Sequence, residues 1–212
     1  IRTDPDRLGT ALNDALRSIA SANPRQLAGV FDYTDFNNRK ALPPENLAQV
    51  VRHFDALGPL TKARVPPDML GQAYEWLIAK FAAAAGKAGG EFYSPEPVGV
   101  LGARLLAPPP EATAYDPTCG SGGLLLHLRE EAFRLHGNRA RALTLFGQEL
   151  KPTTWAIARM NMLLHGAAGA ATIEQGDTLL APAFLSGGEL RKFDLIIANP
   201  PFSSKNWGHD RF

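Results

Sequence analysis

Cysteine is nearly absent from this 212-residue sequence, and the single Cys119 excludes a disulfide within the chain and any cysteine-rich zinc site. The five histidines show no metal-ligand spacing, so we expect no metal site. The sequence has no run of about 18 apolar residues, and no secretory leader precedes the first predicted helix, which favours a cytoplasmic protein without a membrane span. The sequence also has no large excess of charge, because its 22 basic residues nearly balance its 21 acidic residues. The chain therefore lacks the basic surface of an autonomous DNA-binding domain.

The hydrophobic pattern changes near residue 88 and divides the chain into two predicted domains. Residues 1–88 form a helical domain, because apolar residues recur at helical spacing and prolines stand at helix starts. Its three predicted helices cover residues 5–22, 43–54 and 66–85. The third is expected to bury one apolar face, made of Leu70, Ala73, Tyr74, Leu77, Ile78 and Phe81.

Residues 89–212 show short apolar runs that alternate with helical stretches at a spacing of about 30 residues, typical of strand-helix-strand units. The predicted strands cover residues 112–115, 143–147, 171–174 and 194–198, and the predicted helices cover residues 98–106, 124–135 and 153–165. This alternation predicts an α/β fold, a doubly wound and mostly parallel sheet.

The last predicted strand, which we expect to be buried, ends at a polar motif. Asn199 is followed by two prolines and by Phe202. Pro200 and Pro201 have no backbone N–H and hold the chain extended, so nearby carbonyls lack partners in the sheet. The Oδ1 atom of Asn199 and the Pro200 carbonyl can then accept both protons of an exocyclic amino group, while Phe202 stacks on the ring that carries it. An ordinary turn at the end of a strand is the alternative.

A glycine-rich turn follows the first predicted strand, at residues 116–124. Glycines let the backbone approach a ligand, and the helix that follows offers free N–H groups to a carboxylate or phosphate. No lysine follows the glycines, which argues against a nucleoside triphosphate loop, and Leu125 occupies the position where a dinucleotide fingerprint needs glycine. A tight turn without any ligand remains the alternative.

Acidic residues follow three successive strands. Asp116 opens the glycine turn, Glu149 ends the second predicted strand, and Asp177 follows the third. At the carboxyl edge of a parallel sheet, Glu149 can accept the hydroxyls of a ribose and Asp177 can accept an adenine amino group. Each one alone is equally compatible with a helix cap or a solvated charge.

Taken together, these motifs resemble those of the DNA amino-methyltransferases that use S-adenosylmethionine. The likeness covers the whole chain, including the helical N-terminal domain. The matching segments follow in the order 91–98 (EFYSPEPV), 116–123 (DPTCGSGG), 147–150 (GQEL), 176–177 (GD) and 199–202 (NPPF). They are most similar to the modification subunit of type I restriction-modification systems. The resemblance implies a Rossmann-like methyltransferase sheet that is incomplete at its C-terminal end, with its first four strands, and transfer of a methyl group to N6 of adenine.

The resemblance also implies a role for each motif. The methionine end of the cofactor is expected to contact Glu91, Phe92, Tyr93, Ser94 and Pro95, and its amino acid part to contact Asp116, Gly120, Ser121, Gly122 and Gly123. Glu149 takes the ribose hydroxyls and Asp177 the cofactor's adenine. The flipped target adenine is expected to lie against Asn199, Pro200, Pro201 and Phe202. Ser94 stands where the family usually has threonine, and Glu96 where it often has arginine.

The same resemblance implies partners: DNA, a specificity subunit that binds two modification subunits, and in some complexes a restriction subunit. Other activities remain open, namely methylation of cytosine N4 or of glutamine side chains in proteins. The sequence begins at Ile1 and ends soon after the NPPF motif, so an inactive cofactor-binding fragment is another possibility. Cytosine C5 methylation is disfavoured, because Cys119 lies in the glycine turn and not in the NPPF segment.

Overall fold

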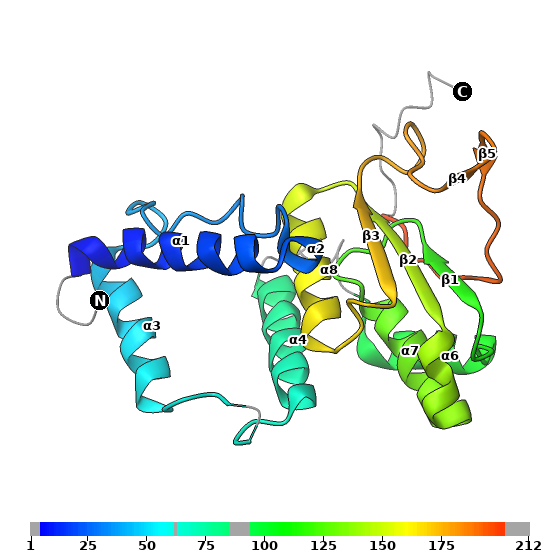
Figure 1. The fold of residues 1–212 in the computed structure, drawn as a ribbon, viewed down its shortest axis with the longest axis horizontal. Helices are drawn as coiled ribbons and strands as arrows, with labels where there is room; N and C mark the ends of the chain where they lie inside the picture. The colour runs from blue at the N-terminus through cyan, green and yellow to red at the C-terminus, as the bar shows by residue number, and fades with distance from the viewer. Residues whose placement is uncertain (1–4, 62, 85–93, 202–212) are drawn as a thin grey trace. The chain divides into compact units, whose positions relative to one another are not determined.

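The chain divides into two compact units in the computed structural model, Ile1–Met69 and Leu70–Phe212 (Figure 1). The structure describes residues 5–61, 63–84 and 94–201. The division falls within helix α4 (Pro67–Ala84), so most of this helix belongs to the second unit, although its sequence pattern grouped it with the first. The domain boundary predicted between residues 88 and 89 lies outside the described residues.

The first unit is helical. It contains α1 (Pro5–Ala22), α2 (Pro24–Leu27) and α3 (Pro44–Ala56), and a proline opens each of the last two. Leu8 on α1 packs with Leu47 and Ala48 on α3, which form the buried centre of this unit. The helices predicted over residues 5–22 and 43–54 are confirmed.

No helix in the described ranges is long and apolar enough to cross a bilayer.

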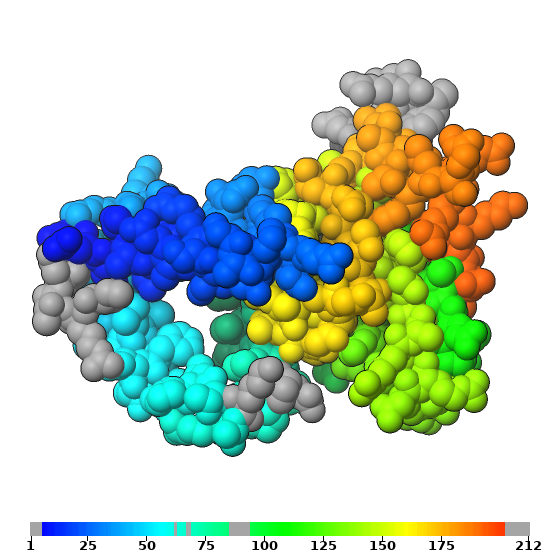
Figure 2. Space-filling model, viewed as in Figure 1, coloured from blue at the N-terminus to red at the C-terminus, as the bar shows by residue number. Residues whose placement is uncertain are grey.

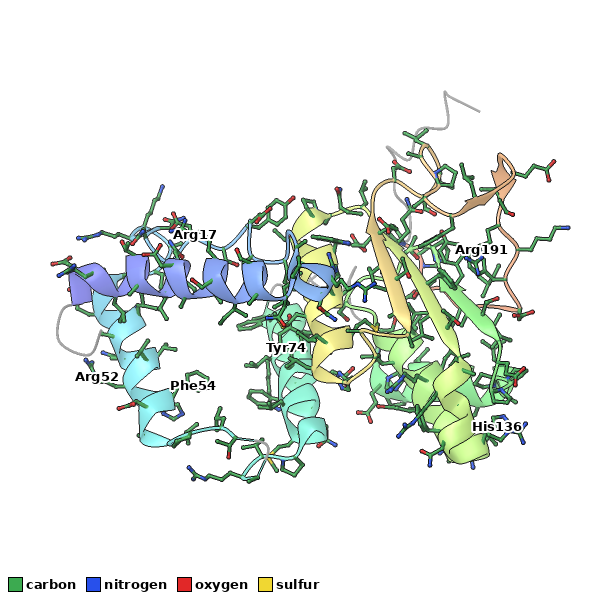
Figure 3. All side chains as sticks on the ribbon, in the orientation of Figure 1. Arg17, Arg52, Phe54, Tyr74, His136 and Arg191 are labelled. Atoms are coloured by element: carbon green, nitrogen blue, oxygen red, sulfur yellow. The ribbon has the colours of Figure 1, made fainter. Side chains whose placement is uncertain are left out.

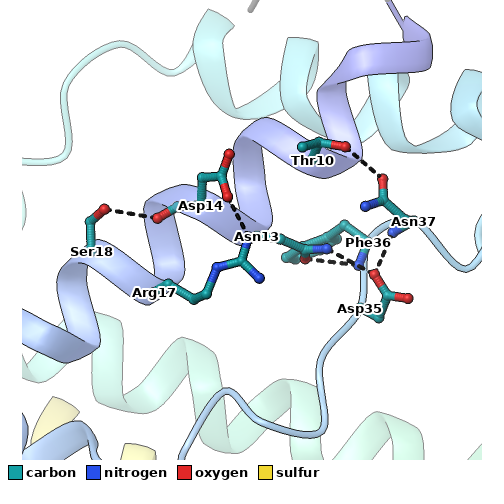
Figure 4. Close-up of polar contacts among 8 residues, drawn as sticks. All are labelled: Thr10, Asn13, Asp14, Arg17, Ser18, Asp35, Phe36 and Asn37. Atoms are coloured by element: carbon teal, nitrogen blue, oxygen red, sulfur yellow. Dashed lines mark hydrogen bonds and ion pairs between the residues drawn. The ribbon is translucent and has the colours of Figure 1, made fainter.

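Polar contacts fix the loop at residues 35–37 against α1 (Figure 4). Asn13 Nδ2 donates to Asp35 Oδ1 at 2.8 Å, and the Phe36 N–H donates to Asn13 Oδ1 at 3.0 Å. Thr10 Oγ1 donates to Asn37 Oδ1 at 3.3 Å. The Asn37 N–H and the Asn13 amide donate to the Asp35 carboxylate and lower its pKa. These bonds add to the packing of Phe36 against the buried centre of the unit.

The second unit is built on a parallel sheet. Its four strands are β1 (Thr113–Asp116), β2 (Thr144–Glu149), β3 (Ala171–Gln175) and β6 (Leu195–Ile196). They lie in the order β3-β2-β1-β6, and each neighbouring pair is parallel. The α/β prediction is therefore confirmed, with each strand close to its predicted position. Because all four strands point the same way, their carboxyl ends meet at one edge of the sheet.

Helices cover one face of this sheet. They are α6 (Glu96–Leu106), α7 (Gly123–His136), the 3₁₀ segment η1 (Gly137–Ala142) and α8 (Pro152–Leu164). Leu125 and Leu128 on α7 pack with Leu145 on β2 and with Met162 on α8 in a continuous buried core. Helix α6 packs on α7, which places the start of α6 near the carboxyl ends of the strands.

Aromatic rings cover the opposite face. Tyr115 stacks on Phe193 with ring centroids 4.6 Å apart, and Phe146 meets Phe184 edge to face at 5.2 Å. Arg191, labelled in Figure 3, belongs to the segment between β3 and β6. Its guanidinium lies 4.2 Å from the centre of the Phe146 ring. These contacts fix the chain between β3 and β6, so the backbone returns to the sheet edge in one defined position.

A short hairpin within that segment was not predicted. Strands β4 (Leu185–Ser186) and β5 (Glu189–Leu190) pair antiparallel, and both residues of the turn, Gly187 and Gly188, have positive φ. Such a two-residue turn needs this conformation, which glycine adopts without strain. The hairpin residues lie at the surface of the second unit (Figure 2).

Two predictions about burial are wrong. Strand β6 is only partly buried: Leu195 packs against the core, whereas Ile196 is 59% exposed, because among the described residues β6 pairs only with β1. The predicted apolar face of α4 is also largely exposed, with Phe81 at 69%. This helix turns Gly71 and Glu75 inward instead, and a Cβ atom on Gly71 would lie 2.7 Å from the His165 ring. Close approach to a polar ring, and not apolar burial, sets its orientation.

Candidate functional site

A cavity of about 1280 Å³ opens at the carboxyl ends of the strands in the second unit. The predicted site residues that line it are Ser94, Asp116, Gly120, Ser121, Gly123, Glu149, Asp177, Asn199, Pro200 and Pro201. Two other predicted residues, Pro95 and Gly122, are the N-caps of α6 and α7 and do not line the cavity. Glu91, Phe92, Tyr93 and Phe202 lie outside the described residues.

The glycine turn forms the floor of this cavity. The Cys119 N–H donates to the Gln148 carbonyl at 3.0 Å, and the Gly122 N–H donates to the Cys119 carbonyl at 2.7 Å. Gly122 has a φ of 82°, and a Cβ atom there would lie 2.5 Å from Met162 Cε. The turn therefore requires glycine for both its conformation and its packing. Burial raises the pKa of the Cys119 thiol, which is 5% exposed, well above its usual value.

Glu149 ties the end of β2 to the glycine turn. Its Oε2 accepts the Gly120 N–H at 3.1 Å, and its Oε1 accepts the Lys151 N–H at 2.8 Å. The residue is 7% exposed, and burial raises the pKa of its carboxyl. Each oxygen keeps a further lone pair, so the contact with ribose hydroxyls is compatible with these bonds and stays a prediction.

Asp116 carries an unsatisfied carboxylate oxygen into the cavity wall. Its Oδ1 accepts the Thr118 N–H at 3.0 Å, whereas its Oδ2 is buried and has no partner among the described residues. Burial, opposed by that bond and reinforced by the charge of Glu149, raises its pKa to about 7. The Thr118 hydroxyl is buried and unpaired within the same described ranges. Unsatisfied polar atoms beside a cavity are typical of a site that a polar ligand completes.

Asp177 has a structural contact of its own. Its Oδ1 accepts the N–H groups of Leu179 and Leu180 at 2.9 and 3.1 Å, so this carboxylate caps a turn. The side chain is half-buried and lines the cavity, and its second oxygen is compatible with the predicted contact to an adenine amino group. The capping interpretation is confirmed, and the binding interpretation stays a prediction.

Asn199 faces the cavity from the end of β6. Its Nδ2 donates to Ser94 Oγ at 3.1 Å, and its side chain is half-buried. Pro200 and Pro201 are exposed and also line the cavity. The amide therefore lies along the same cavity as Gly120 and Glu149, which is the arrangement that its predicted role requires.

Helices α4 and α7 supply a wall that the sequence motifs did not indicate. Glu75, Trp76, His127 and Glu130 all line the cavity. His127 Nδ1 lies 3.2 Å from Glu130 Oε2, and this contact raises the pKa of His127 and lowers that of Glu130. Burial raises the pKa of Glu75. The spacing of His127 and Glu130, three residues apart on one helix, was the available signal.

Asn161 is a second residue that sequence reasoning missed. It is 0% exposed on α8, and its Nδ2 donates to the Ser121 carbonyl of the glycine turn at 3.0 Å. Its Oδ1 has no partner in the part of the chain that the structure describes. Burying an amide side chain costs free energy unless the amide forms hydrogen bonds. Here the bond from Asn161 ties α8 to the glycine turn. A polar residue between Met160 and Met162, inside the helix predicted over residues 153–165, was the available signal.

The sheet and its helices define a fold class, a parallel α/β sheet with a cavity at its strand ends. A putative class I S-adenosylmethionine-dependent methyltransferase from Listeria monocytogenes shares this fold, with a TM-score of 0.58 over 93% of this chain and 58% of that one, at 13% identity.

The particular family follows from sequence. Residues 65–212 match the N-6 DNA Methylase family, and the chain belongs to it. It is 32% identical over 200 residues to the type I restriction enzyme MjaVIII methylase subunit of Methanocaldococcus jannaschii, a match that covers 92% of this chain and 34% of that protein. The type I restriction-modification system methyltransferase subunit from Streptococcus thermophilus has a TM-score of 0.74 at 30% identity, over 94% of this chain and 43% of that one. The chain spans about a third of the length of the curated relatives it matches.

Proposed function

We propose that the protein containing this chain transfers a methyl group from S-adenosylmethionine to N6 of adenine in DNA. The observation that carries the proposal is that Asn199 and Pro200 line one cavity with the glycine turn, Glu149 and Asp177. One cavity thus combines a hydrogen-bond-accepting amide with the residues expected to bind the cofactor. This combination suits transfer of a methyl group to an amino group on an aromatic base.

The described residues fit the cofactor. The unsatisfied Oδ2 of Asp116 suits the α-ammonium group of the cofactor's methionine part, and the N–H groups at the start of α7 suit its carboxylate. Glu149 and Asp177 would take the ribose hydroxyls and the adenine amino group. When bound, S-adenosylmethionine supplies an electrophilic methyl group on a sulfonium.

The chain's own groups act on the other reactant. The N6 nitrogen of adenine is a poor nucleophile, because its lone pair is delocalised into the ring. Asn199 Oδ1 and the Pro200 carbonyl accept hydrogen bonds from its two N–H groups, which stabilises the positive charge that develops on the nitrogen during attack. As the new N–C bond forms, the bond from the methyl carbon to the sulfonium sulfur breaks, and the methylated nitrogen then loses one of its two protons to water. The target base must first leave the duplex, and Phe202 is the ring on which it would stack.

Partners follow from the family and from charge. The relatives at 29–35% identity are named type I restriction enzyme methylase subunits, and this chain has a net charge of only +1. We therefore propose that a specificity subunit, with two modification subunits bound to it, holds the DNA, and that a restriction subunit joins some complexes.

Labelled product identifies the reaction. The complete protein, assembled with its specificity subunit, is incubated with DNA and isotope-labelled S-adenosylmethionine, and the digested nucleosides are measured by mass spectrometry. Labelled N6-methyladenine is expected. Labelled N4-methylcytosine would assign a different base, label in glutamine would assign a protein substrate, and the absence of label from an intact complex would overturn the proposal.

A further inference from the structure

A hydrogen bond joins Asn199 to a residue 105 positions earlier in the chain. Asn199 Nδ2 donates to Ser94 Oγ at 3.1 Å, and both side chains are half-buried and line the cavity. The family resemblance gives Ser94 a contact with the methionine end of the cofactor. The geometry gives it a different neighbour.

Packing alone cannot fix the direction of an asparagine amide. Its oxygen and its NH₂ group are nearly equal in size, so a half-turn about the terminal torsion exchanges a proton acceptor for a donor without changing the shape. Only the oxygen can accept a hydrogen bond from the substrate's amino group. A donor in its place would face another donor, which is repulsive.

The anchor at Ser94 is itself held in position. Ser94 stands directly before Pro95, the N-cap of α6, and α6 packs on α7 in the core of the second unit. A Cβ atom on Gly102 of α6 would lie 3.1 Å from Ile197 Cδ1, so this helix also runs close to the end of β6. The serine and the amide are therefore brought together by the same helix.

We propose that Ser94 is a positioning residue for the methyl transfer: its hydroxyl accepts from Asn199 Nδ2 and thereby keeps Asn199 Oδ1 directed to the substrate's amino group. The inference rests on the proposed function and deepens it. Serine and threonine both provide the required oxygen, whereas alanine does not, so the nature of residue 94 determines how often the amide is correctly oriented.

The experiment compares wild type, Ser94→Ala and Ser94→Thr in the assembled complex. Two quantities are measured for each, the kcat for methylation of adenine in DNA and the Kd for S-adenosylmethionine by calorimetry. Ser94→Ala is expected to lower kcat about tenfold, the equivalent of one hydrogen bond of about 1.4 kcal/mol, with the cofactor Kd unchanged. Ser94→Thr is expected to restore most of the rate, which a loss of folding would not allow.

Ser186→Ala is the matched control, because Ser186 is exposed on β4 and does not line the cavity. It should leave both quantities unchanged. A raised cofactor Kd with an unchanged kcat in Ser94→Ala would return Ser94 to the cofactor contact and overturn the inference, as would an unaffected variant. An inactive wild type would overturn the proposed function itself, whereas an active wild type with a Ser94→Ala variant of equal kcat overturns only this inference.

Discussion

The two sides of the cavity are built differently. On the side of the glycine turn, Asp116 and Glu149 are almost fully buried and accept backbone N–H groups. On the side of β6, Asn199 is half-buried, the two prolines are exposed, and the strand itself is two residues long. We call these the glycine-turn side and the amide side.

The two sides differ in how they are attached to the folded core of the second unit. The glycine-turn side is part of the folded core, so changing it should affect cofactor binding and stability together. The amide side is attached by a few separate bonds, such as that from the Thr113 N–H to Asp194 Oδ2 at 2.8 Å and that from the Ile197 N–H to the Tyr115 carbonyl at 3.0 Å. Changing it should affect the chemistry with little effect on stability.

The largest effect is expected from Asn199→Ala in the complete protein. Loss of the proton-accepting oxygen should lower the rate of methyl transfer by about 100-fold or more, the range seen when one transition-state hydrogen bond is removed. The cofactor Kd should stay the same, because the glycine-turn side is intact. Single-turnover kinetics and calorimetry measure the two. Asn46→Ala, an exposed residue on α3, is the control, and a rate near wild type would remove the amide side from the mechanism.

Glu149→Ala tests the glycine-turn side. The substitution leaves the Gly120 and Lys151 N–H groups without their carboxylate acceptor, and it removes the expected ribose contact. We expect the Kd for S-adenosylmethionine to rise about 30-fold, which is about 2 kcal/mol, and the melting temperature to fall. Glu174→Ala, an exposed residue on the neighbouring β3, should change neither. Equal cofactor binding in Glu149→Ala would contradict the assigned cofactor side.

The pH dependence of cofactor affinity tests the predicted role of Asp116 on the glycine-turn side. The pKa of Asp116 is raised to about 7 by burial, and only its ionised form attracts an ammonium group. Cofactor affinity should therefore increase about tenfold between about pH 6 and pH 8 and lose this dependence in Asp116→Asn. Without cofactor the sign is opposite: the raised pKa stabilises the fold fully below the usual value of 3.8, and this stability is lost as the pH rises through about 7. Calorimetry and thermal unfolding across this range check both signs, and flat affinity in the wild type would contradict the ammonium contact.

The smallest effect on function is expected from Gly122→Ala, because Gly122 does not line the cavity. The positive φ and the clash with Met162 Cε should cost about 2 kcal/mol of unfolding free energy. We expect only about a threefold weaker cofactor affinity, since the turn is displaced and not removed. Gly169→Ala is the control, because nothing lies within 4 Å of the added atom and no left-handed backbone is required. Denaturant unfolding measures the difference, and equal stability of the two variants would show that the turn is not strained.

Sequence periodicity was sufficient to predict the sheet and most helix positions. Strand β1 begins one residue from its predicted start, and α1 coincides with the predicted range. These elements were predictable because each carries a local apolar pattern, at helical spacing in α1 and in a short run in β1. The strand-end residues Asp116, Glu149 and Asn199 were predictable for a related reason, since parallel strands bring their carboxyl ends together.

Features that depend on a partner far away in the sequence were not predictable. The bond between Ser94 and Asn199 has no local signature, and neither has the contact between Gly71 of α4 and the His165 ring. The hairpin was different, because the Gly187-Gly188 pair is a local signal for a two-residue turn between strands. Burial of β6 was overestimated because an apolar run indicates a strand but not what covers it.

The sole cysteine of the chain lies in the floor of the cavity, in a turn closed by the Gly122 N–H and the Gln148 carbonyl. Its thiol is shielded and its ionisation is suppressed, so thiol-reactive dyes should leave the folded chain unlabelled and attach only when this turn opens. The rate of Cys119 labelling therefore measures how often this turn opens. Slower labelling with added S-adenosylmethionine would report binding of that ligand without any engineered probe.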